Sequence, residues 1–121
     1  MIRILPVPEE SLPGLCREKG LSPRGTALRG YTAAQGEEPL GWCVAAAGEP
    51  CVILGVEAQD PQIADGLLRA ALFPLYQGGA ARYRFESTPG GPLPAGYVLR
   101  GEGELAELFA PCGERRRKTD E

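Results

Sequence analysis

Several residue types and patterns are scarce or missing, and their absence narrows the possible functions. The 121 residues include no histidine, and no two of the four cysteines form a C-x-x-C pair. These gaps argue against a structural zinc site, and we expect no metal. There is also no apolar run of about 18 residues, the length needed to cross a membrane. The first apolar stretch, residues 1–7, is interrupted by Pro6 and is not typical of a signal peptide, so we expect a cytoplasmic protein.

An excess of one charge is missing too. The chain has 13 Lys and Arg residues and 16 Asp and Glu residues. The formal net charge of −3 gives no reason to expect a nucleic-acid partner. The one basic run, residues 115–118, lies in a polar segment beside Asp120 and Glu121. We interpret residues 113–121 as a solvated C-terminal tail and residues 1–112 as a single domain.

What the sequence does contain is typical of one small globular domain. Apolar residues make up 43% of the chain, and the 17 glycines and 12 prolines predict tight turns between short elements. In a reducing cytoplasm we expect the cysteines Cys16, Cys43, Cys51 and Cys112 to be small buried apolar residues. Cys43 and Cys51 flank a turn at residues 47–50 and could face each other across a hairpin, so a redox pair remains the alternative.

The first half of the chain predicts short strands and one helix. Residues 9–19 predict a helix that ends at Gly20 and carries Pro13 in its first turn. Residues 51–58 are almost continuously apolar, which predicts a central strand covered on both faces. Gly55 inside that strand indicates a bulge, or the close approach of another backbone or a ligand. The other strands are expected over residues 2–6, 26–35 and 40–47.

The clearest helix of the sequence follows the central strand. Asp60 is a capping residue, and Pro61 suits the first helical position. Apolar residues then recur at helical spacing, and Pro74 is expected to kink or end the helix near Phe73. A strand over residues 81–87 completes a right-handed crossover, so this strand should lie parallel to the central one.

The last third of the chain is dominated by proline and glycine. Residues 88–95 read T-P-G-G-P-L-P-A, which predicts no regular structure. We expect a last strand over residues 97–100 and a short strand or helical turn over residues 104–109.

This succession of elements resembles the GNAT superfamily of N-acetyltransferases. The resemblance is sharpest over residues 56–69, where the family signature is Arg or Gln, two variable residues, Gly, one variable residue, and Gly or Ala. Gln59 and Ala64 fit this signature, whereas Gln62 stands where glycine is expected. A leucine pair in the following helix and the pair Gly96-Tyr97 also match. The resemblance covers about residues 1–110 and implies an α/β (α+β) GNAT-like mixed sheet with flanking helices, truncated after the fifth strand.

The resemblance also implies acetyl-CoA as the cofactor. In the family, a bulge in the fourth strand, here near Gly55, separates it from the fifth strand, and the pantetheine arm enters the gap. Backbone N–H groups of the loop and helix N-terminus hold the pyrophosphate. Pro61 offers no N–H, and Asp60 adds a negative charge, so a merely well-capped helix is the alternative. The residues implied are Val56 and Ala58 for main-chain contacts, and Gln59, Gln62, Ile63 and Ala64 around the pyrophosphate.

Catalysis would rest on a carboxylate, because the chain has no histidine. Glu57, at the end of the central strand, is the candidate general base, acting through a water molecule. Its alternative is a solvated residue at a strand end. The family's acid is a tyrosine on the helix after the fifth strand, and residues 88–95 replace that helix without a tyrosine. We interpret Tyr76 and Tyr97 as packing residues.

Three functions therefore remain open. The first is an N-acetyltransferase that uses acetyl-CoA on a small-molecule or peptide amine. The second is a GNAT-shaped domain that binds acyl-CoA without turnover. The third is a protein-interaction module, in the form of a homodimer built on an exposed sheet edge or on the groove left by the missing helix.

Overall fold

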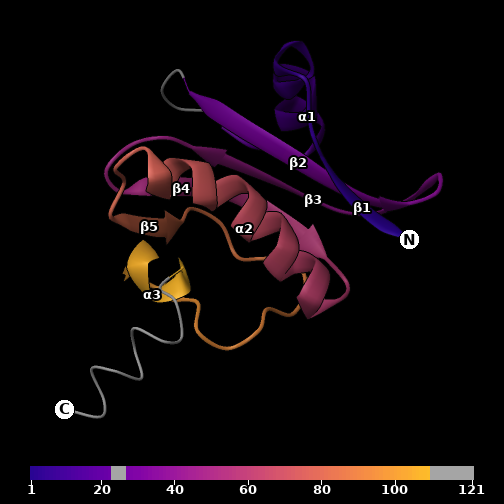
Figure 1. Cartoon of the computed structure of the whole chain (residues 1–121). Helices are drawn as coiled ribbons and strands as arrows, with labels where there is room; N and C mark the ends of the chain where they lie inside the picture. Colours follow the sequence, from indigo (N-terminus) through magenta and orange to yellow (C-terminus); the bar gives the residue numbers. More distant parts are fainter. Residues whose placement is uncertain (23–26, 110–121) are drawn as a thin grey trace.

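A six-stranded mixed sheet is the centre of the computed structural model, which describes residues 1–22 and 27–109. The strands lie side by side in chain order (Figure 1), and every neighbouring pair is antiparallel except β4 and β5, which are parallel. The mixed α+β class is therefore confirmed. Cys112 and the predicted tail lie outside the described residues. The strands are β1 (Ile2–Pro6), β2 (Leu28–Gln35), β3 (Glu38–Ala46), β4 (Cys51–Ala58), β5 (Arg82–Phe85) and β6 (Glu102–Glu104).

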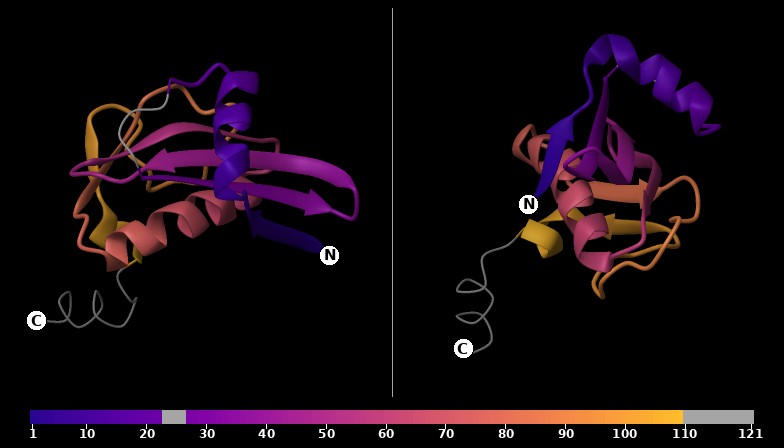
Figure 2. Two further views of the ribbon diagram at one scale, coloured as in Figure 1. Left: turned by 90° about the horizontal axis from the view of Figure 1, so that it is seen from above. Right: turned by 90° about the vertical axis from the view of Figure 1, so that its right-hand side faces the viewer.

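Two helices cover opposite faces of this sheet (Figures 1 and 2). A 3-10 turn (Glu9–Ser11) leads into α1 (Leu12–Glu18), with Pro13 in its first turn as predicted, and Cys16 packs with Val44 and Leu54. The longer α2 (Pro61–Gln77) buries its apolar stripe against the other face, where it meets Ile53 and Tyr83. The sheet is thus enclosed from both sides over β3 and β4, because apolar side chains alternate to both faces there.

The central strand β4 carries the bulge that Gly55 predicts. Ala45 of β3 pairs with Ile53, but the residue before it, Val44, pairs with Gly55, so Leu54 is an extra residue in β4. A side chain at Gly55 would come within 2.8 Å of the Trp42 ring and 3.0 Å of Leu21. Glycine is needed here because the backbone bends against these two side chains.

Helix α2 begins as its sequence predicts but ends later. The side chain of Asp60 accepts a hydrogen bond from the N–H of Gln62 at 2.7 Å, and Pro61 is the first helical residue. Of the two outcomes predicted at Pro74, an end of the helix near Phe73 is wrong, because the helix continues through Pro74 to Gln77, where Gly78 caps it. Leu75, after the proline, is buried in the core, and this packing offsets the one backbone bond that proline cannot make.

The chain after β5 differs from the sequence prediction. Residues 97–100 are not a strand: the hydroxyl of Tyr97 donates to Asp65 at 2.6 Å, and the N–H of Val98 donates to the Tyr83 hydroxyl at 3.0 Å. These bonds hold the segment against side chains of α2 and β5, so it joins no ladder. The pairing partner of β5 is β6, with Gly103 opposite Tyr83, and α3 (Leu105–Phe109) is the helical form of the predicted 104–109 element.

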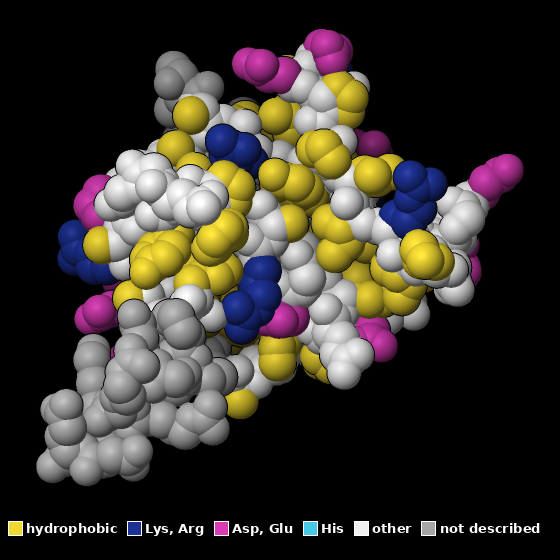
Figure 3. Space-filling model, in the orientation of Figure 1, with side chains coloured by type: hydrophobic (Ala, Val, Ile, Leu, Met, Phe, Trp, Pro, Cys, Tyr) yellow, Lys and Arg dark blue, Asp and Glu magenta, His cyan; other side chains and the backbone are white. Residues whose placement is uncertain are grey.

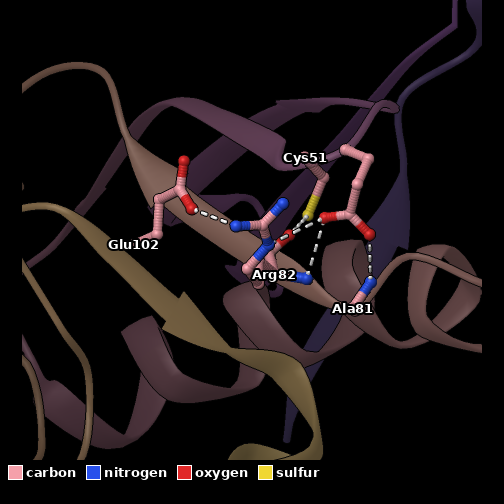
Figure 4. A network of polar contacts seen from close by, with 5 residues as sticks. Cys51, Ala81, Arg82 and Glu102 are labelled. Carbon is pink, nitrogen blue, oxygen red and sulfur yellow. Dashed lines mark hydrogen bonds and ion pairs between the residues drawn. The ribbon is translucent and has the colours of Figure 1, made fainter.

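The loop between β3 and β4 is fastened to β5 by the carboxylate of Glu49, which bonds to the main chain of Ala81 and Arg82, two residues labelled in Figure 4. Glu49 accepts hydrogen bonds from the N–H groups of Ala81 at 2.9 Å and Arg82 at 3.2 Å. The Arg82 guanidinium also pairs with Glu102 of β6 at 2.9 Å. The N–H of Ala81, followed by that of Arg82, lowers the pKa of Glu49 below its usual value.

The cysteines of this region are buried free thiols rather than a facing pair. Cys43 lies opposite Val56 in the β3–β4 register, so it does not face Cys51 across the hairpin. Burial raises the pKa of Cys43 to about 12 and that of Cys51 to about 11, so both stay protonated at neutral pH. Cys16 is also buried.

Candidate functional site

The site lies where the parallel strands β4 and β5 stop pairing. Their ladder runs from Cys51 to Ile53, and the N–H of Glu86 makes a last bond to the carbonyl of Ile53 at 2.9 Å. The bulge at Leu54 follows directly, and the next residues of β4 are no longer paired with β5. A bulge at this point bends β4 away from its neighbour, which is the local geometry that the GNAT resemblance predicts.

A later part of the chain pairs with β4 beyond the point where β5 stops pairing with it. We call residues 88–91 the glycine segment. Gly90 forms an isolated parallel bridge with Glu57. Its N–H donates to the carbonyl of Val56 at 2.8 Å, and its carbonyl accepts from the N–H of Ala58 at 3.1 Å. The glycine segment therefore pairs with the second half of β4 as a very short strand.

Two adjacent glycines make this close approach possible. A Cβ on Gly91 would overlap the carbonyl oxygen of Ala58, and Gly91 has a φ of +130°, which other residues rarely adopt. A Cβ on Gly90 would lie 3.0 Å from Cγ of Glu57. The glycine segment lies against β4 because it has no side chains at these two positions.

The glycine segment occupies the main-chain groups of the two β4 residues, Val56 and Ala58, that are expected to contact acetyl-CoA. Val56 and Ala58 are both buried, and the main-chain groups that would face a pantetheine arm are hydrogen-bonded to Gly90. A ligand that used the same edge of β4 would have to displace the glycine segment, since a backbone N–H or C=O at a strand edge serves one neighbour at a time.

The start of α2, where the pyrophosphate is expected, is capped from within the chain. Pro61 has no N–H, the N–H of Gln62 is taken by the Asp60 carboxylate, and that of Ala64 by the Asp60 carbonyl. Of the first-turn residues 61–64, only Ile63 has an N–H that none of these bonds uses. Asp60 also places its negative charge at the helix N-terminus, which is where an anion would bind.

Glu57 lies where the sequence predicts, exposed near the end of β4. Its carboxylate accepts a hydrogen bond from the indole N–H of Trp42 at 2.8 Å, and the two residues face each other in the β3–β4 register. The Lys19 ammonium lies 5.4 Å from the centre of the Trp42 ring. No sequence pattern predicts this group of three residues, because their contact depends on strand register and on where α1 ends.

The tyrosines that were interpreted as packing residues do pack. Tyr97 is half-buried, and its pKa is raised by burial and by its hydrogen bond to Asp65. Asp65 also pairs with Arg69 at 2.9 Å, and the two residues are one turn apart on α2 (i,i+4). Tyr76 stacks on Phe109 with ring centroids 5.4 Å apart. Neither tyrosine contacts Glu57 by any of these interactions, so each serves the core.

The hollows of the described structure include two that Glu57 does not line. A cavity of about 430 Å³ lies along residues 88–99, and Pro92, Leu93 and Tyr97 contribute to its lining. Another of about 590 Å³ lies between the turn after β1 and strand β2, lined in part by Val7 and Arg29. Glu57 lines neither of them, although Thr88, Pro89 and Gly91 of the glycine segment line the first.

Metal and membrane chemistry find no support in the described residues. Across residues 1–22 and 27–109, no three His, Cys, Asp or Glu side chains gather closely enough to ligate a metal ion. None of the helices in the same two ranges combines the length and the apolar character needed to span a membrane.

Comparison with known proteins adds one distant likeness. No protein-family model matches the chain, and no curated protein matches it. Among solved structures, the ribosomal-protein-S18-alanine N-acetyltransferase from Escherichia coli is similar, with 15% sequence identity and a TM-score of 0.48. The match covers 69% of this chain and 64% of the enzyme. A likeness of this size carries no functional argument, so the function rests on the residues at the β4 edge.

Proposed function

We propose that this protein is a GNAT-like domain whose acyl-CoA slot is closed by its own glycine segment, and that it acts in this form as a non-catalytic protein-interaction module. One observation carries the proposal: both main-chain groups of β4 that would face the pantetheine arm are hydrogen-bonded to Gly90. Because the glycine segment belongs to the same chain, its effective concentration at the slot is high, and a free ligand must compete with it.

The start of α2 supports the same function. An anion at a helix N-terminus is held by free N–H groups and by the helix dipole. Here Pro61 supplies no N–H and the Asp60 carboxylate already caps Gln62. A diphosphate would therefore gain few hydrogen bonds and would meet a like charge. We expect weak or absent binding of CoA to the closed form.

The test compares ligand-induced thermal shifts in three proteins: the wild type, Gly91→Ala and Gly96→Ala. Alanine at residue 91 overlaps the Ala58 carbonyl and must push the glycine segment off β4. Gly96 is the matched control in the same loop, because it also has a positive φ, +111°, but nothing lies within 4 Å of its Cβ position.

The expected results separate a closed slot from an open one. Acetyl-CoA and CoA should leave the melting temperature of the wild type and of Gly96→Ala unchanged and should raise that of Gly91→Ala, since a ligand of the folded state stabilises it. A dose-dependent rise in the wild type equal to that in Gly91→Ala would contradict the proposal, because the glycine segment would then close nothing.

The second candidate function is N-acetyl transfer to a small-molecule or peptide amine. It is favoured by the bulge at Leu54 together with the exposed Glu57 carboxylate further along the same strand. The amine nitrogen would bond to the thioester carbonyl carbon of acetyl-CoA, the C–S bond would break, and CoA would leave as a thiolate that takes up a proton from solvent. Glu57 would accept the proton that the attacking amine loses, directly or through one water molecule. This function requires the glycine segment to move away from β4 first.

Release of free thiol from acetyl-CoA in the presence of a pool of amines measures this second function. Glu57→Gln keeps the size of the side chain and removes the base, so it should lower the release rate by about 10²-fold or more. Glu37→Gln, at an exposed carboxylate in the β2–β3 turn, is the control and should not change the rate. Equal rates in the two variants would exclude Glu57 as the base.

A further inference from the structure

The outer edge of β1 presents a defined set of backbone groups. β1 is the first strand of the sheet, with β2 as its neighbour on one side. The N–H of Val7 donates to the carbonyl of Gly30 in β2 at 2.8 Å. Because alternate residues of a strand point their N–H and C=O groups to opposite sides, Arg3 and Leu5 also face β2. Ile2, Ile4 and Pro6 therefore point theirs away from the sheet.

Within residues 1–22 and 27–109 no strand pairs with this edge, and its residues are mostly apolar. Four of the five residues of β1 are exposed, and Ile4 is half-buried. Ile2 and Leu5 each keep 47% of their surface exposed. Figure 3 shows hydrophobic side chains gathered next to a basic one at the N-terminal end of the molecule. Long apolar edges usually attract another strand, and Arg3 and Pro6 are the features of β1 that are known to discourage pairing.

The side chains of β1 divide between the two faces of the sheet. The Ile4 side chain reaches α2, since its Cδ1 would lie 2.7 Å from a Cβ on Gly66. Strand alternation then places Ile2 and Pro6 on the α2 face, and Arg3 and Leu5 on the α1 face. Any strand that pairs with this edge meets an apolar row on one face and an Arg–Leu pair on the other.

We propose that β1 pairs with β1 of a second copy of this chain, as antiparallel strands related by a two-fold axis at Ile4. In that register the two Ile4 residues exchange two hydrogen bonds. Each Ile2 N–H also donates to the Pro6 carbonyl of the other copy. All outward donors are then satisfied. In each copy the Ile2 carbonyl is then the one outward acceptor without a partner, because it faces Pro6 of the other copy, which has no N–H.

Charge selects this register over its neighbours. A two-fold axis at Arg3 would allow the same number of hydrogen bonds, but it would place the two Arg3 side chains directly opposite each other, which is unfavourable. An axis at Leu5 would lose half of the bonds, because Pro6 would replace a donor on both sides. With the axis at Ile4, Arg3 lies opposite Leu5 of the other copy, and its aliphatic stem covers that leucine.

The size of the edge sets the strength of the dimer. The two six-stranded sheets would join into one continuous sheet through five residues from each copy. A contact of that length is small for a protein interface, so the dimer should be weak and in equilibrium with monomers. It is isologous and closed, so it should not grow into longer assemblies. It does not depend on whether the β4 slot binds acyl-CoA.

The test is sedimentation equilibrium of the full chain over a concentration series, with two matched variants, Leu5→Lys and Leu5→Glu. In the proposed register residue 5 lies opposite Arg3 of the other copy. Lysine should therefore raise the dissociation constant of the dimer by about tenfold, counting two like-charge pairs. Glutamate should keep or lower that constant. Because leucine is half-exposed, both changes leave the core intact, and circular dichroism checks the fold.

A backbone variant gives a second, independent result. Ile2→Pro removes one outward donor from each copy without touching a bond to β2, so it should weaken the dimer, whereas Ile2→Ala keeps the N–H and should weaken it less. A chain that stays monomeric through the whole series overturns the proposal. An equal loss of association in Leu5→Lys and Leu5→Glu overturns the register, and species larger than dimers overturn the closed two-fold pairing.

Discussion

The contact between the glycine segment and β4 makes a stability prediction that can be worked out from the structure. Alanine at residue 91 must break the two hydrogen bonds between Gly90 and β4, because its Cβ overlaps the Ala58 carbonyl. Two backbone bonds contribute about 1–3 kcal/mol together. The positive φ of Gly91 adds about 1–2 kcal/mol for a residue with a side chain. Gly91→Ala should therefore cost about 2–5 kcal/mol.

The control variant isolates the contact from the backbone strain. Gly96→Ala carries the φ cost of about 1–2 kcal/mol and no overlap. Urea unfolding of both variants should thus give a difference of about 1–3 kcal/mol in the free energy of unfolding, with Gly91→Ala the less stable. Equal free energies for the two variants would refute the inference that the glycine segment is bonded to β4 in solution.

Three further predictions concern the frame around the site. Asp60→Ala removes the cap from the N–H of Gln62 and should lower the free energy of unfolding by about 1 kcal/mol, measured by urea unfolding. The folded-state pKa of Glu49 is lowered, first by the N–H of Ala81, so its contribution to stability is complete above its unfolded pKa and is lost as the pH falls through the folded pKa. Melting temperatures between neutral and acid pH should fall less steeply in Glu49→Gln than in the wild type. Leu68→Ala, at a fully buried position of α2, should cost about 2–5 kcal/mol by the same unfolding assay.

The sequence predicted the elements whose signals are local. Asp60 and Pro61 mark the start of α2 because capping needs only neighbouring residues. The apolar run of β4 indicates its central place, and Gly55 indicates its bulge, since a glycine inside such a run has few other uses. The pattern left open whether Pro74 kinks or ends α2, and the helix continues because Leu75 is buried in the core, which a sequence pattern does not report.

The elements that the sequence missed are held by distant contacts. Gly90 pairs with β4 although its surroundings, T-P-G-G-P, have no strand propensity, because the bonds come from the backbone alone. β6 has the sequence E-G-E, and its glycine lies opposite Tyr83, so no apolar pattern marks it. The Tyr97 hydroxyl binds Asp65 of α2 and prevents the predicted last strand. Glu57 is exposed where it was expected, and its role as a base stays a prediction.

The position of Trp42 has a practical consequence for studying this protein. It is the only tryptophan of the sequence, and its indole N–H is bonded to Glu57, the residue that bridges to Gly90. Any departure of the glycine segment changes the surroundings of that carboxylate and so the polarity around the indole. The intrinsic fluorescence of the unlabelled chain should therefore report opening of the β4 edge in real time, under stopped flow as well as at equilibrium.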